Sequence, residues 1–122
     1  MHLTHSYNAE FHIIEITCKG KMSFEKLVAE QNPTFALAME KNTNKFLLDL
    51  SEYEQSLSTI NIMNSVSGYG EKTTRDICIA IISPICEDAR QDIRFYETVC
   101  LNRGWNVRMF SLRHDAINWL AN

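Results

Sequence analysis

Two runs of apolar residues dominate the hydrophobic pattern of the chain. Residues 45–50 read KFLLDL and residues 77–82 read ICIAII, and neither run alternates between polar and apolar positions. Short continuous apolar runs are typical of parallel strands that are covered by helices on both faces. We therefore predict that these segments are central strands lying side by side in a sheet.

Further strands are predicted near both ends of the chain. Residues 2–8 and 11–18 read as two short strands joined by a tight connection, and residues 105–110 read as a last strand. Apolar residues occur at both odd and even positions of 11–18, which indicates a strand with two covered faces. The first two strands should form an antiparallel hairpin, which adds one antiparallel strand to the sheet.

The segments between these strands carry apolar residues at helical spacing, so a helix is expected between each pair of parallel strands. Polar residues that favour the N-cap position mark the expected helix starts: Ser23, Asn32, Ser58, Ser83 and Ser111. The side chains expected to face the core from these helices are Phe24, Leu27, Phe35, Ala36, Met39, Ile60, Met63, Ile85, Ile93, Ala116, Trp119 and Leu120. The order of elements predicts an α/β fold with a mixed, mostly parallel sheet of about five strands flanked by helices.

Length, composition and charge narrow the class of protein. The 122 residues suit one domain spanning 1–122, and a hydrophobic fraction of 45% argues against a disordered chain. The net charge is −3 and the basic residues are scattered, so no nucleic acid partner is expected. No segment approaches the roughly 20 apolar residues that span a bilayer, and no signal-peptide pattern opens the chain. These features predict a cytoplasmic protein without a membrane span.

The sequence carries no constellation that catalysis would require. No glycine-rich phosphate loop and no G-x-S-x-G motif follows any predicted strand. The cysteines lack C-x-x-C spacing and the histidines lack H-x-x-x-H spacing, so neither a metal nor another cofactor is expected. The four cysteines, Cys18, Cys78, Cys86 and Cys100, read instead as reduced thiols. The chain is therefore predicted not to be an enzyme.

Asp49 and Ser51 lie where the first apolar run ends, and ligands of such sheets usually bind beyond the carboxyl ends of the strands. A carboxylate at the end of a buried strand must be paired or hydrogen-bonded. One interpretation is that Asp49 accepts backbone N–H groups from the loop after the strand. The other is that Asp49 orients a ligand or a hydroxyl group.

Three stretches carry a resemblance to a known family. Residues 95–105 (FYETVCLNRGW), 107–110 (VRMF) and 116–120 (AINWL) resemble the C-terminal half of STAS-like bacterial proteins, relatives of the stage II sporulation protein AA type of anti-sigma-factor antagonist. Residues 46–51 are similar to the family's strand that leads to its second helix, and Gly20 stands where the family turns into its first helix. The resemblance covers nearly the whole chain, but its motifs are packing motifs, which indicate a fold more directly than an activity.

The family resemblance also implies a regulatory switch. In anti-sigma-factor antagonists a phosphorylated serine or threonine lies in an Asp-Ser-Ser/Thr-Gly-Leu type motif at a helix N-terminus. Here the corresponding segment lacks both the Asp-Ser pair and the glycine, although it offers the hydroxyl groups of Ser56, Ser58 and Thr59. A phosphate there would meet Glu52 and Glu54, which carry like charge.

Two functions follow as expectations. The first is a non-catalytic regulatory or interaction module that binds a protein partner or forms a homodimer, with the exposed first strand pairing to another sheet edge. The second is a binder of a small apolar or lipid-like ligand in a pocket between helices and sheet. The residues expected to line that pocket are Phe24, Leu27, Phe35, Met39, Ile60 and Met63.

Overall fold

The computed structural model of the chain describes residues 2–20, 33–34, 36–53, 77–85, 87–102 and 105–121. In these residues the chain forms strands β1 (His2–Asn8), β2 (Ile13–Gly20), β3 (Lys45–Tyr53), β4 (Cys78–Ile82) and β5 (Asn106–Phe110), and helices α3 (Glu87–Asn102) and α4 (Arg113–Ala121). Residues 36–41 are also helical. The expected helix starts at Ser23, Asn32 and Ser58 lie outside the described residues.

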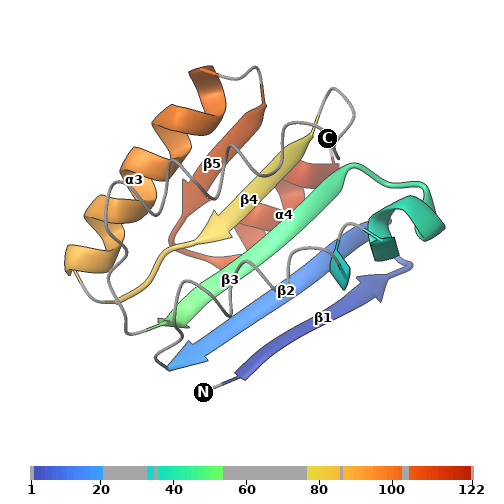
Figure 1. Cartoon of the computed structure of the whole chain (residues 1–122), viewed down its shortest axis with the longest axis horizontal. Coiled ribbons are helices and arrows are strands. Elements are labelled where there is room, and N and C mark those ends of the chain that lie inside the picture. Colours follow the sequence, from blue (N-terminus) through green and yellow to red (C-terminus); the bar gives the residue numbers. More distant parts are fainter. Residues whose placement is uncertain are drawn as a thin grey trace.

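The five strands form one sheet whose spatial order follows their order along the chain (Figure 1). β1 runs antiparallel to β2, and β2, β3, β4 and β5 run parallel to one another. The central pair is the one predicted from the apolar runs, because Lys45 to Asp49 of β3 lie opposite Cys78 to Ile82 of β4. The prediction of a mixed, mostly parallel sheet flanked by helices is confirmed.

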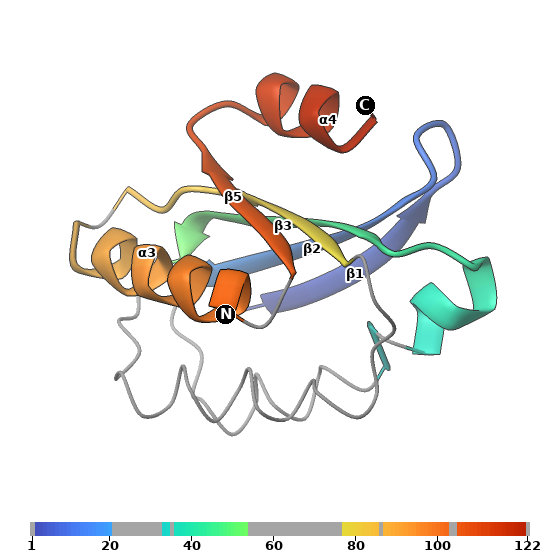
Figure 2. The ribbon, with the colours of Figure 1, turned by 90° about the horizontal axis from the view of Figure 1, so that it is seen from above.

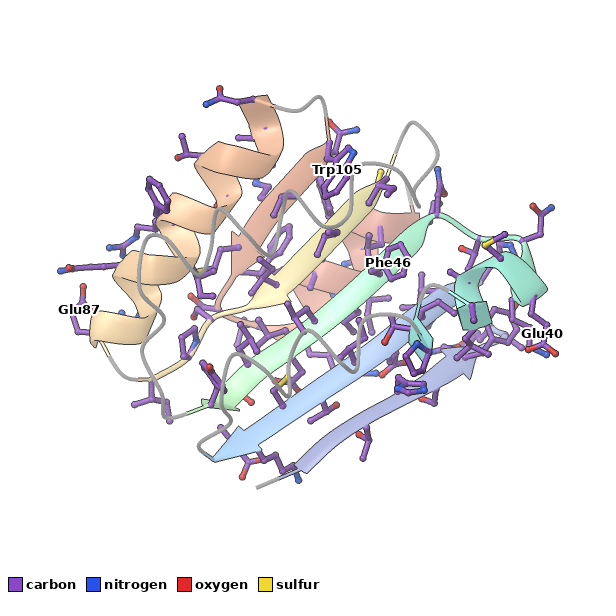
Figure 3. The ribbon with its side chains drawn as sticks, viewed as in Figure 1. Glu40, Phe46, Glu87 and Trp105 are labelled. Carbon is purple, nitrogen blue, oxygen red and sulfur yellow. The ribbon has the colours of Figure 1, made fainter. Side chains whose placement is uncertain are left out.

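Helices cover both faces of the sheet. Figure 2 shows α4 on one face, with α3 and the helical residues 36–41 on the other. The larger core lies on the α3 face, where Phe46 and Trp105 both project over the sheet, while Glu40 and Glu87 lie at its margins (Figure 3). Its buried residues are Ile14, Cys18, Ala38, Phe46, Leu50, Tyr53, Ile77, Ile79, Ile81, Ile93, Trp105 and Val107.

A second, smaller core lies between the sheet and α4. Alternation along β3 and β4 directs Leu47 and Ala80 to this face, where both are fully buried. Ala116 and Leu120 of α4 pack against them, as their spacing of four residues predicted. The ring of Trp119 is half-buried and meets Phe110 with 5.7 Å between ring centroids. Both faces of the central strands are therefore apolar, which explains their continuous hydrophobic runs.

Two predicted helix faces are wrong. Ile85 is 80% exposed, because α3 begins only at Glu87, and the guanidinium of Arg90 donates to the carbonyls of Pro84 and Ile85 instead. Met39 is 76% exposed, and Ala36 is exposed as well. Among the described residues of this segment, 33–34 and 36–41, the side chains turned towards the core are instead Thr34, Leu37 and Ala38.

The turn between β1 and β2 is also longer than predicted. The side-chain oxygen of Asn8 accepts the backbone N–H groups of Glu10 and Phe11, at 3.0 and 3.4 Å, which extends the turn to His12. His12 has a φ of 59°, in the left-handed region that few residues other than glycine enter. The second strand therefore begins at Ile13 and not at Phe11.

Candidate functional site

The polar end of β3 contains a β-bulge. Thr17 lies opposite Asp49 and Lys19 lies opposite Glu52, so two residues advance on β2 while three advance on β3. Bulges of this kind locally break the ladder and redirect side chains, and they are frequent near functional sites. The end of the apolar run is therefore an irregular feature of the sheet and not a plain strand end.

Asp49 stabilises this bulge through Ser51. One oxygen of the Asp49 carboxylate, Oδ1, accepts the backbone N–H of Ser51 at 3.0 Å and the hydroxyl of Ser51 at 2.7 Å. The N–H group that Asp49 accepts thus lies within β3, which extends to Tyr53, and not in a loop after the strand. The hydroxyl that the carboxylate orients is that of Ser51. The Ser51 side chain is directed at Asp49 and is half-buried.

The thiol of Cys18 lies on the α3 face of the neighbouring strand. Burial raises the pKa of Cys18 from 9.0 to about 12, and the negative charge of Asp49 adds to this effect. A protonated, 1% exposed thiol is a poor nucleophile and a poor metal ligand. Cys18 is therefore a packing residue, as the sequence predicted.

The loops that follow β4 and β5 lie together at the carboxyl end of the sheet. The backbone N–H of Ser83 donates to the carbonyl of Phe110 at 2.8 Å, which ties the two loops side by side. Each loop carries an apolar side chain in solvent: Ile85 is 80% exposed and Leu112 is 61% exposed. At the start of α3, Glu87 forms ion pairs with both Arg90 and Arg94.

Charged groups on the α4 face of β2 are also paired. One carboxylate oxygen of Glu15 contacts Arg113 at the start of α4, and the other accepts the side-chain amide of Asn8 at 2.7 Å. Lys19 pairs with Glu52 at 3.3 Å. Ion pairs this exposed contribute little stability, but they leave the surface beside the hairpin electrically balanced.

His12 fastens the β1–β2 turn to the end of the helical residues 36–41. Its Nε2 lies 2.9 Å from the carbonyl oxygen of Asn42 and therefore carries a hydrogen, and its Nδ1 forms a hydrogen bond with the hydroxyl of Tyr7. The hydroxyl of Thr43 donates to the backbone carbonyl of His12 at 2.7 Å. Lys41 completes the cluster with its ammonium 5.3 Å from the centre of the Tyr7 ring.

Replacing His12 with alanine is expected to lower the free energy of unfolding by about 1–3 kcal/mol. The change removes both ring hydrogen bonds and places alanine at the φ of 59°. His114→Ala is the matched control, because that exposed ring forms its hydrogen bond with Asn118 on its own helix, and we expect a change within about 0.5 kcal/mol. Urea unfolding at neutral pH measures both, and equal effects would contradict the role given to His12.

The outer edge of β1 is the longest regular edge that the structure describes. All seven residues of β1 pair with β2 without a register shift, so alternate backbone groups point away from the sheet along the whole strand. β1 contains no Lys, Arg, Asp, Glu or Pro. Proteins usually protect an exposed edge with such residues or with a bulge.

Several predicted site residues lie outside the described residues. They are the hydroxyl residues Ser56, Ser58 and Thr59 and the pocket residues Phe24, Leu27, Phe35, Ile60 and Met63. Met39 is the one member of the predicted pocket that is described, and its side chain is exposed. In the part of the chain that the structure describes, no three metal-ligating side chains gather at one place, and no helix is long and apolar enough to cross a membrane.

Comparisons with known proteins support the fold and no more. No family model matches the sequence, and no curated protein matches it. Among solved structures, the NMR structure of the protein TM1081 is similar, with a TM-score of 0.59 and 17% sequence identity. The similarity covers 95% of this chain and 86% of that chain. At this identity the likeness concerns the arrangement of helices and strands alone.

Proposed function

We propose that this chain is a non-catalytic interaction module that binds a protein by adding a strand to the edge of β1. The observation that carries the proposal is the regular, uncharged edge of seven residues. An added strand would obtain main-chain hydrogen bonds along this edge, which is a common mode of peptide and protein recognition. A regulatory role of the STAS-like kind is compatible with such binding and is part of the proposal.

The chemistry of the described polar groups favours binding over catalysis. The Asp49 carboxylate is engaged by Ser51, Glu15 is engaged by Arg113 and Asn8, and the Cys18 thiol is buried and protonated. Catalysis requires a nucleophile or base directed at open space within reach of a substrate. These groups are directed at one another instead.

Photo-crosslinking in cells tests the proposal. A photoreactive amino acid at position 6 of β1 should link the chain to a protein, because Ser6 is exposed on the edge strand. The same group at position 108 of the opposite edge strand, β5, is the matched control, since Arg108 is also exposed. Mass spectrometry identifies the linked protein. Crosslinking at position 6 no stronger than at position 108 would overturn the proposal.

A further inference from the structure

We infer that the partner of the β1 edge is a second copy of this chain, placed antiparallel about a two-fold axis at His5. This inference rests on the proposed function, because both use the same edge. Two five-stranded sheets would then join into one continuous sheet through their β1 strands. Such an interface is isologous, so each contact occurs twice.

The sequence of β1 is complementary to itself in this register. With His5 on the axis, residue 2 lies opposite residue 8 of the other copy, residue 3 opposite 7, and residue 4 opposite 6. Every residue of β1 then has a partner, which no other antiparallel register allows. Thr4 lies opposite Ser6, and pairs of small hydroxyl residues are favourable across antiparallel strands. Apart from His5, which meets its own copy on the axis, no pair brings two ionisable side chains together, because the other histidine, His2, lies opposite Asn8.

The surroundings of β1 also admit a second copy. Unpaired charges on β2, the strand next to β1, would repel the same charges of the second copy, because both sets lie close to the two-fold axis. Both charged residues of β2 are compensated: Glu15, which lies opposite Ser6, by Arg113, and Lys19, which lies opposite His2, by Glu52. The charges of β2 beside the interface are therefore balanced, although the whole chain has a net charge of −3.

The other edge of the sheet is less suited to this pairing. β5 has five residues, and Arg108 occupies its centre. An antiparallel pairing of β5 with its own copy about that centre would place two arginines opposite each other, which is unfavourable. A dimer through β1 is therefore favoured over a dimer through β5.

Opposite charges introduced at positions 4 and 6 test the register. The variant Thr4→Glu/Ser6→Lys puts unlike charges opposite each other twice when His5 is on the axis, but shifting the strands by two residues would put like charges together. The matched variant Thr4→Lys/Ser6→Lys differs only in the sign at position 4 and puts like charges together in every one of these registers. Both native side chains are exposed, so neither variant disturbs the core.

Size-exclusion chromatography with light scattering, at low ionic strength and over a range of protein concentrations, measures the molar mass of each chain in solution. The native chain and Thr4→Glu/Ser6→Lys should be dimers, and Thr4→Lys/Ser6→Lys should dissociate with a Kd higher by about tenfold or more. Unfolding in urea should confirm that all three chains are folded. A monomeric native chain, equal dimerisation of the two variants, or a monomeric Thr4→Glu/Ser6→Lys would each overturn the inference.

The crosslinking experiment separates this inference from the proposed function. A product at position 6 with the mass of two chains supports both. A product at position 6 with a different protein, and none with a second copy, retains the interaction module and overturns the homodimer. Absence of any specific product at position 6 overturns both.

Discussion

Replacing Leu47 with alanine is expected to lower the free energy of unfolding by about 2–5 kcal/mol, a large part of the stability of a domain of this size. Leu47 is fully buried on β3, where it packs between the sheet and α4 with Ala80, Ala116 and Leu120. Truncation removes buried methyl groups and leaves a cavity that the flanking strands cannot fill, because the sheet holds both neighbouring backbones in place.

Leu112→Ala is the matched control for Leu47→Ala. Leu112 is 61% exposed before α4, and its backbone carbonyl, which accepts the N–H of Ala116, is retained in the variant. The same chemical change should therefore alter stability by no more than about 0.5 kcal/mol. Urea denaturation followed by circular dichroism measures both variants. A Leu47→Ala loss as small as that of Leu112→Ala would contradict the packing of α4 on the sheet.

Alkaline pH is expected to destabilise the chain through Cys18. Burial and the charge of Asp49 raise the pKa of this thiol in the folded chain from 9.0 to about 12. Below pH 9 the thiol is protonated in both folded and unfolded chains, so its contribution to stability is fully present. Between pH 9 and 12 the unfolded chain loses the proton while the folded chain keeps it, which removes about 1.4 kcal/mol per pH unit and about 4 kcal/mol in total.

The comparison of the native chain with Cys18→Ala isolates this effect from other alkaline titrations. Between pH 8 and 10.5, in the presence of a reductant, the native chain should lose about 2 kcal/mol more than Cys18→Ala. If the free energy of unfolding of the native chain and of Cys18→Ala fell equally with pH, Cys18 would not be the cause of the loss.

The central strands could be predicted because one simple pattern determines them. Residues 45–50 and 78–82 contribute side chains to both hydrophobic cores, one on each face of the sheet. Nearly every position in these segments is therefore apolar, and each run is continuous. The pattern does not depend on the exact ends of any helix. The parallel pairing of β3 with β4 then follows from the length of the connection between them.

The errors arose where a side chain competes with regular backbone hydrogen bonding. Asn8 and His12 reshape the β1–β2 turn, and Arg90 takes the carbonyls that would have extended α3. The prediction that Met39 faces the core is wrong because residues 33–41 are too few for the apolar spacing to identify the buried face of the helix. Such local exchanges depend on geometry that hydrophobic spacing does not encode.

The polar contacts of the candidate site were only partly predictable. The sequence predicted that the Asp49 carboxylate would be hydrogen-bonded, but its partner, Ser51 within β3, was not predicted. The contact between Glu15 and Arg113 joins residues that are 98 positions apart, so only the folded sheet and α4 bring them together. The open β1 edge was expected from its terminal place in the order of strands, whereas its lack of a register shift required the structure.

The sequential order of the strands bears on how the chain emerges during synthesis. Because each strand pairs with the one made before it, the nascent sheet can grow from β1 towards β5 without waiting for a distant segment. Until β5 is made, however, the free side of the growing sheet is β4, whose sequence CIAII has no charge and no proline. Short strands of this composition aggregate readily when exposed, so the interval between β4 and β5 is the stage at which nascent chains are most prone to associate wrongly.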